Sequence, residues 1–158
     1  MILDSHTKRG VTLLELLLVI AILAILAAAG IGLYYNVRLT VGLEEEERAI
    51  VSTLRLARSH AVLGERANEW GVRFDNTDAA SPFYAVFEGR EYASALTVST
   101  SRMAQEIVFQ TPPAGLALDV VFAQGAGTTT PTSVTIGLKN NPAQSKTISV
   151  SGQGIITR

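Results

Sequence analysis

The sequence predicts an α+β protein in which a long N-terminal helix packs on an antiparallel β-sheet head. Three observations favour this fold class. A charge-free apolar run extends from Leu16 to Tyr35, a helical pattern of apolar residues continues to about residue 63, and strand-like segments separated by turn residues follow. A chain of 158 residues has room for one globular domain. A helix that covers consecutive antiparallel strands is an α+β arrangement.

The composition restricts the chemistry that the chain can perform. It contains no cysteine and two histidines, His6 and His60, so disulfides and cysteine-based sites are excluded. We interpret His60 as an ordinary helix residue, because a single imidazole without a companion makes neither a metal site nor a catalytic triad. We therefore expect no catalytic residue, no metal and no cofactor. The formal net charge of −1 does not favour a nucleic-acid binder.

The apolar run is long enough to cross a bilayer, since a helix of this length spans about 30 Å of hydrocarbon. Lys8 and Arg9 precede it, and the positive-inside rule then leaves the short N-terminus in the cytoplasm. A cleaved secretory signal peptide fits less well, because its apolar region is shorter than this run and ends at a small-residue cleavage site. We therefore predict a transmembrane segment at residues 11–35, for which a plain single-pass anchor is the simplest alternative role.

The residues that lead into the apolar run carry a recognisable motif. Residues 8–15 read Lys-Arg-Gly-Val-Thr-Leu-Leu-Glu. This stretch resembles the prepilin processing site, in which basic residues and a glycine precede an apolar residue, usually Phe, and Thr-Leu-x-Glu enters the helix. The resemblance implies that a prepilin peptidase cuts between Gly10 and Val11, removes residues 1–10 as a leader peptide and methylates the new N-terminus at Val11.

Glu15 is the one charged residue within the predicted membrane segment. An unpaired carboxylate there costs a few kcal/mol, so an ionisable residue in a membrane helix indicates a function and a partner. The resemblance implies that the partner is the N-terminal amine of a neighbouring subunit, here at Val11. Such a pair neutralises both charges in a water-poor filament core. The alternative is that the Glu15 carboxylate reaches water at the near interface.

After the membrane segment the helical period continues while the polarity changes. Apolar residues recur at spacings of three, four and seven and predict one buried stripe; they are Leu43, Ile50, Leu54, Ala57 and Ala61. We interpret the acidic run Glu44–Glu47 as a solvated face or as a source of intersubunit salt bridges. Gly64 suits a helix C-cap. We therefore expect an amphipathic segment at residues 36–64, with the helix ending near Leu63.

Residues 65–158 are expected to form a β-rich head. Asn68–Phe74 and Phe83–Phe87 read as a hairpin around the turn residues 75–78, and Trp70 is expected in the core. Residues 125–130 and 139–144 read as turns. Further strands are predicted at Glu106–Phe109, Leu116–Phe122, Ser133–Leu138, Lys146–Val150 and Gly154–Thr157.

The head carries a second pattern that resembles the GspH/FimT-type domain of type IV pilin-like proteins. It consists of Glu106–Phe109, Pro113–Gly115, Val121 and Phe122 followed by Gly127, Val134–Ile136, and Ile148–Val150 with Gly152 and Gly154. The resemblance implies a structural, non-enzymatic role as a minor pseudopilin of a type II secretion pseudopilus. The alternative is a minor pilin that primes or caps a type IV pilus. Some pilus members bind DNA through a basic tail, but Arg158 alone supplies too little charge for that.

These roles imply a set of partners and a location. The partners are other pilins or pseudopilins in a hetero-oligomeric filament, a prepilin peptidase and an inner-membrane assembly platform. The chain would cross the bacterial inner membrane once, with its head in the periplasm. An alternative of a different class is a membrane-anchored extracytoplasmic enzyme or receptor. Its candidate carboxylates, Asp75 and Asp78, lie in a predicted turn with no His, Cys or Lys beside them.

Overall fold

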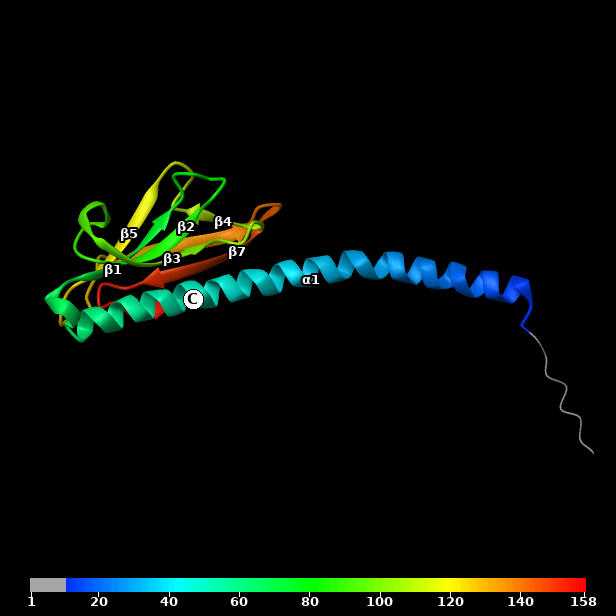
Figure 1. Cartoon of the computed structure of the whole chain (residues 1–158), viewed down its shortest axis with the longest axis horizontal. Helices are drawn as coiled ribbons and strands as arrows, with labels where there is room; N and C mark the ends of the chain where they lie inside the picture. Colours follow the sequence, from blue (N-terminus) through cyan, green and yellow to red (C-terminus); the bar gives the residue numbers. More distant parts are fainter. Residues whose placement is uncertain (1–10) are drawn as a thin grey trace, which may run out of the picture. The chain divides into compact units, whose positions relative to one another are not determined.

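The computed structural model describes the backbone of residues 11–158 and the side chains of residues 11–27 and 37–158. Within these residues, the helix α1 (Leu13–Val62) precedes all of the strands (Figure 1). The chain divides into two compact units, Met1–Arg38 and Leu39–Arg158, and α1 contributes residues to both.

The two ends of α1 are set by local chemistry. At its start, the backbone N–H of Glu15 donates a hydrogen bond to Thr12 Oγ1 at 3.2 Å, so that Thr12 acts as the N-cap. At its end, Gly64 has a φ of +63°, and its N–H donates to the carbonyl of Ala61 at 3.1 Å. Glycine adopts this left-handed conformation without a Cβ penalty. The prediction that the helix ends near Leu63 is confirmed.

The strands form two antiparallel sheets of four strands each, whereas one sheet was expected. The first has the order β3-β2-β1-β5 and the second the order β4-β6-β7-β8. The strands of the first sheet are β1 (Trp70–Asp75), β2 (Phe83–Glu88), β3 (Leu96–Arg102) and β5 (Ala117–Phe122). Those of the second are β4 (Ile107–Thr111), β6 (Thr132–Leu138), β7 (Asn141–Val150) and β8 (Ile156–Thr157). Between residues 11 and 158, η1 (Glu65–Ala67) and η2 (Tyr92–Ser94) are short 3-10 turns.

Two strands differ from the sequence-based expectation. Strand β3 was not predicted, and all of its residues are exposed, so it lacks the alternation of buried and exposed positions that marks a strand. Strand β7 begins at Asn141, within the segment that was expected to be a turn. Asn141 pairs with Leu138 across a register shift, and the carbonyl of Pro142 accepts a hydrogen bond from Gln110 at 2.8 Å. The predicted turn at residues 139–144 is therefore wrong from Asn141 onward.

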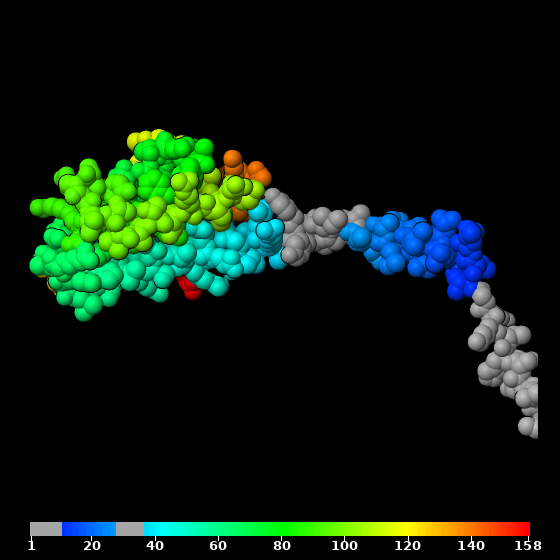
Figure 2. Space-filling model, in the orientation of Figure 1, coloured from blue at the N-terminus to red at the C-terminus, as the bar shows by residue number. Residues whose placement is uncertain are grey.

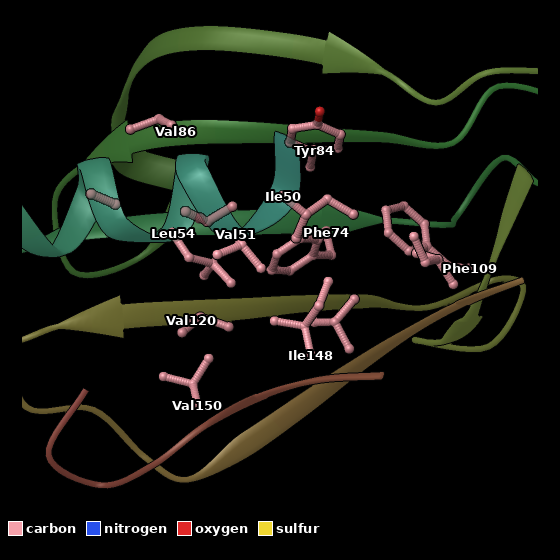
Figure 3. Packing of buried hydrophobic residues seen from close by; sticks show 14 of the residues in the cluster. Ile50, Val51, Leu54, Phe74, Tyr84, Val86, Phe109, Val120, Ile148 and Val150 are labelled. Atoms are coloured by element: carbon pink, nitrogen blue, oxygen red, sulfur yellow. The ribbon is translucent and has the colours of Figure 1, made fainter. Parts of the chain in front are cut away.

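The core of the second unit lies between α1 and the two sheets. All five residues of the predicted apolar stripe are buried, and Ile50 and Leu54 are fully enclosed. Figure 3 shows Ile50, Val51 and Leu54 on α1 directed toward the strands. The rings of Phe74 on β1 and Phe109 on β4 meet edge to face at 5.8 Å, which joins the first sheet to the second. Trp70, at 2% exposed, belongs to this core, as predicted.

Candidate assembly surfaces

The N-terminal motif is only partly within the described residues. Lys8, Arg9 and Gly10 lie outside them, while Val11 is 73% exposed at the edge of the described region. Thr12 and Glu15 have the spacing of a capping box, in which the N-cap side chain binds the backbone N–H of the third helical residue. Thr-x-x-Glu before an apolar run is the usual form of this motif, so the cap could have been recognised from the sequence. The Glu15 carboxylate thus lies in the first helical turn, where the helix dipole favours negative charge.

The first unit presents a continuous apolar surface. Every described side chain from Val11 to Ala27 is exposed, among them large aliphatic residues such as Leu13, at 79%, and Ile25, at 70%. Figure 2 draws this stretch of helix in blue. The predicted membrane segment, residues 11–35, also includes residues 28–35, whose side chains are not described. Among the residues that the structure describes, no helical stretch has both the length and the apolarity needed to span a membrane.

The four carboxylates of the acidic run on α1 differ in burial: Glu45 is exposed, Glu44 and Glu46 are half-buried and Glu47 is buried. Glu45 is exposed, and Glu44 faces Arg48 at 3.5 Å. Glu47 is 6% exposed, and its carboxylate lies 3.8 Å from Lys146 Nζ on β7. Since consecutive helical residues point around the cylinder, part of a four-residue run must face the sheets. The interpretation of this run as a solvated face is therefore wrong for Glu46 and Glu47.

Glu46 is partly enclosed by β2. Burial raises the pKa of its carboxyl, against hydrogen bonds from the Tyr84 hydroxyl and the Ala104 backbone that lower it. Burial and then the adjacent Glu46 carboxylate raise the pKa of Tyr84 to about 12. These interactions, together with the pair of Glu47 and Lys146, hold one side of this part of α1 against the strands.

The C-terminal end of α1 is held by two glycine turns that pack around Arg58. The guanidinium of Arg58 donates a hydrogen bond to the carbonyl of Gln153 at 3.3 Å. Gly127 and Gly154 have φ values of +64° and +71°. A Cβ on Gly154 would lie 2.1 Å from the carbonyl oxygen of Gly127 and 2.8 Å from Arg58 Nε. The glycines of the predicted head pattern therefore mark the place where the turn after β5 and the turn after β7 meet above the helix.

His60 has a structural role that its neighbours in the sequence do not indicate. Its ring stacks on Trp70, with centroids 4.4 Å apart, and Nδ1 contacts the Glu65 carboxylate. Trp70 Nε1 donates to the backbone carbonyl of Glu65 at 3.2 Å. His60 thus links the last turn of α1 to β1.

The carboxylates considered for an enzyme are engaged in local structure. Asp75 accepts hydrogen bonds from Arg73 Nε, at 2.8 Å, and from the Thr77 backbone N–H, at 3.0 Å. Burial opposes ionisation of Asp75, but hydrogen bonds from Thr77 and Arg73 outweigh it and lower the pKa. Asp78 accepts from the Ala80 N–H at 2.9 Å. Both carboxylates therefore stabilise the turn between β1 and β2.

Two family models match the chain. Residues 5–31 match the prokaryotic N-terminal methylation motif, and residues 47–154 match the type II transport protein GspH. The second match covers more than half of the chain and includes the last turns of α1 and the strands β1 to β7. No curated protein sequence matches the chain significantly.

Solved structures share the fold at low sequence identity. The minor pseudopilin EpsH from the Type 2 Secretion System of Vibrio cholerae aligns with a TM-score of 0.53 and 12% identity, over 73% of this chain and 94% of that one. The type IV minor pilin FimU of Pseudomonas aeruginosa aligns with a TM-score of 0.52 and 17% identity, over 75% of this chain and 90% of that one. A second crystal form of FimU gives a TM-score of 0.51.

Proposed function

The chain belongs to the GspH family of type II transport proteins, and we propose that it is a minor pseudopilin, a structural subunit of a type II secretion pseudopilus. The observation that carries this proposal is the presence of two signals on one chain. The methylation motif at residues 5–31 precedes the GspH match at residues 47–154, and α1 extends through the end of the first into the second. The N-terminal part carries the processing site and the membrane anchor, and the head is the folded domain of the subunit.

Processing and assembly are proposed to use adjacent residues. A prepilin peptidase cuts the bond between Gly10 and Val11, after the basic residues Lys8 and Arg9, and the amine of Val11 becomes the N-terminus and is methylated. That amine then pairs with the Glu15 carboxylate of a neighbouring subunit. The exposed position of both residues at the start of α1 supports this pairing. A buried pair of opposite charges requires both members, so this mechanism needs the Glu15 carboxylate and a free main-chain amine at position 11.

The exposed aliphatic residues of α1 support a membrane location before assembly. Leucine, isoleucine and valine side chains from Val11 to Leu26 are exposed without any covering residue in the described part of the chain. Lipid before assembly and neighbouring helices afterwards would both remove this surface from water. We place the chain in the bacterial inner membrane, with residues 1–10 in the cytoplasm and the head in the periplasm. Its partners are other pseudopilins, the peptidase and the assembly platform.

A minor pilin of a type IV pilus is the second candidate, because FimU resembles the chain in fold as closely as EpsH does. Fold alone does not distinguish the two roles, whereas the match to GspH favours secretion. Deletion of the gene in its own host separates them. We expect loss of type II substrate secretion with intact pili, restored by the wild-type gene. Loss of pili with normal secretion would instead assign the chain to a pilus.

A further inference from the structure

A hollow in the head is lined by three segments that are distant in the sequence. Its volume is about 340 Å³, which falls within the range of small-molecule binding sites. The turn between β1 and β2 supplies residues 79–82, and the connection from β3 to β4 supplies residues 102–105. Strand β4 supplies Ile107 and Val108, and Lys139 follows the end of β6. We refer to this site as the β3–β4 hollow.

The charged side chains of the β3–β4 hollow are all positive. Arg102 and Lys139 line it, and no carboxylate is present among its described lining residues. The acids next to these segments in the sequence do not neutralise the two cations, since neither Asp78 nor Glu106 forms an ion pair within the described chain. Two cations at one hollow repel each other, and a bound anion offsets this repulsion.

Both cations have N–H groups available for a ligand. Arg102 Nη1 donates a hydrogen bond to Ser81 Oγ at 3.0 Å, so the turn after β1 holds the guanidinium at the hollow. The other guanidinium N–H groups remain available. The ammonium of Lys139 has no hydrogen-bond or ion-pair partner in the part of the chain that the structure describes. A guanidinium and an ammonium at one site can both donate to the same carboxylate.

Much of the remaining lining is apolar. Pro82, Met103 and Ile107 are buried residues of the head, and all three line the hollow. A site with apolar walls and a few polar groups fits a ligand that has an apolar body and one anionic group. Acetate and inorganic phosphate have the charge but lack the apolar body. A polypeptide chain that ends in an apolar residue has both.

We propose that the β3–β4 hollow binds the C-terminal carboxylate of a partner polypeptide whose last side chain is apolar. Arg102 and Lys139 donate to the carboxylate, and the last side chain lies against Met103 and Ile107. Capture of a chain terminus is a recurring mode of peptide recognition. A chain end needs to enter the hollow once, whereas an internal segment must also leave it. This inference goes beyond the proposed function, because it requires neither processing nor filament assembly.

Peptide binding to the detergent-solubilised full-length chain tests the carboxylate. The probe is a fluorescein-labelled Ser-Gly-Ser-Gly-Leu peptide with a free C-terminus, and the matched control is the same peptide with a C-terminal amide. Fluorescence anisotropy measures both affinities. We expect the free acid to bind at least about ten-fold more tightly, because the amide cannot accept charge-assisted hydrogen bonds. Equal affinities, or no binding of the free acid up to about 1 mM, overturn the proposal.

Competition tests whether the hollow recognises a chain end. The unlabelled free-acid peptide should displace the labelled one at a lower concentration than acetate or inorganic phosphate. A peptide that ends in serine instead of leucine should compete several-fold less well, because it lacks the apolar side chain. Displacement by acetate or phosphate as effective as that by the peptide means that only a general anion site is present, and it overturns the proposal.

Charge removal locates the binding site. Lys139→Gln breaks no ion pair or hydrogen bond of the described chain, and it should weaken binding of the free acid by about three- to ten-fold. Arg102→Gln should do the same, with a thermal melt to confirm that the variant is folded, because Arg102 also holds the turn. Arg90→Gln is the matched control, since Arg90 is 86% exposed and lies between β2 and β3. An unchanged affinity in Lys139→Gln, or an equal loss in Arg90→Gln, overturns the assignment to this hollow.

Discussion

Gly154 shows most clearly how a single residue shapes the head. Its φ of +71° is unfavourable for any other residue, and its Cα faces the backbone of Gly127 at a distance that excludes a Cβ. We expect Gly154→Ala to destabilise the chain by about 2 kcal/mol or more, from the conformational cost and the clash together. Thermal unfolding of the detergent-solubilised chain measures the loss.

The control for this change is Gly125→Ala. Gly125 also has a positive φ, of +74°, but a Cβ there would meet no atom within 4 Å. Its cost should therefore be limited to the backbone term of about 1 kcal/mol. Equal losses at the two glycines would show that the close packing around Arg58 does not contribute to stability.

Glu46 predicts a pH effect with a defined sign. Burial raises its folded-state pKa above the ordinary value, so folding favours the protonated form. The stabilisation is then complete below the unfolded-state pKa and is lost as the pH rises through the folded-state pKa. Glu46→Gln removes the buried charge and keeps an acceptor for Tyr84. It should raise the unfolding midpoint at pH 7 and have progressively less effect as the pH falls toward 4.

Glu45→Gln provides the comparison for Glu46, because its side chain is exposed and unpaired in the described chain. Its unfolding midpoint should follow that of the wild type across the same pH range. A lower midpoint for Glu46→Gln at pH 7 would contradict the assignment of burial as the dominant influence on this carboxyl.

At the scale of elements, α1 depends on the sheets that cover its buried stripe. Leu54 is fully buried, and truncation to alanine should cost about 2 to 5 kcal/mol. Since an isolated amphipathic helix is marginal in water, the helical signal of residues 39–62 and the strand signal should be lost together. Circular dichroism, recorded during a thermal melt at one wavelength sensitive to helix and one sensitive to strand, tests this. Two separate transitions would contradict the packing of this part of α1 on the sheets.

The same substitution on the other side of the helix is a matched control. Leu56 lies two residues away in α1 and is 50% exposed. Leu56→Ala should change the stability of the monomer by less than about 1 kcal/mol, because little contact is lost. A large loss at Leu56 would mean that this side chain is covered in the folded monomer.

The elements differ in how well the sequence predicts them. Helix α1 was predictable because its apolar stripe has a clear period and Gly64 marks its end. Strand β3 was not predictable, because the side chains on both of its faces are exposed. Its residues therefore do not alternate between buried and exposed positions. The start of β7 was missed because Asn and Pro usually form turns, whereas here they begin a strand at a register shift.

The candidate site was predictable where its signal is local. The N-terminal motif that matches at residues 5–31 could be recognised from residues 8–15, and the capping interaction of Thr12 could have been read from the same residues. The roles of Gly10, Val11 and Glu15 stay predictions. The burial and pairing of the Glu46 and Glu47 carboxylates were not predictable. They depend on Tyr84 and Lys146, which are distant in the sequence and come close to α1 only in the folded chain.

At the scale of the whole molecule, Glu15 is expected to act only when subunits meet. Glu15→Gln removes the charge, so membrane insertion should persist, because an amide costs less in lipid than a carboxylate. Cleavage after Gly10 precedes assembly and should also persist. Incorporation into filaments should fall by at least about ten-fold, since breaking a buried charge pair costs about 3 kcal/mol or more.

Three readouts on the same Glu15→Gln sample separate the explanations: the membrane fraction, the mature N-terminus and the filament content. Glu106→Gln, on the exposed surface of the head, serves as the control and should behave as wild type. Normal incorporation of Glu15→Gln would remove this carboxylate from the assembly mechanism. Poor insertion would point instead to an error in the proposed anchor.

The most direct test of the central claim is the mass of the intact chain after coexpression with a prepilin peptidase. We expect a mature protein that begins at Val11, with or without one methyl group. We expect no cleavage in a Gly10→Val variant, because its side chain obstructs a site that requires glycine. A chain that keeps residues 1–10 in the presence of active peptidase, or that begins at any residue other than Val11, would contradict the assignment of this protein as a processed pseudopilin.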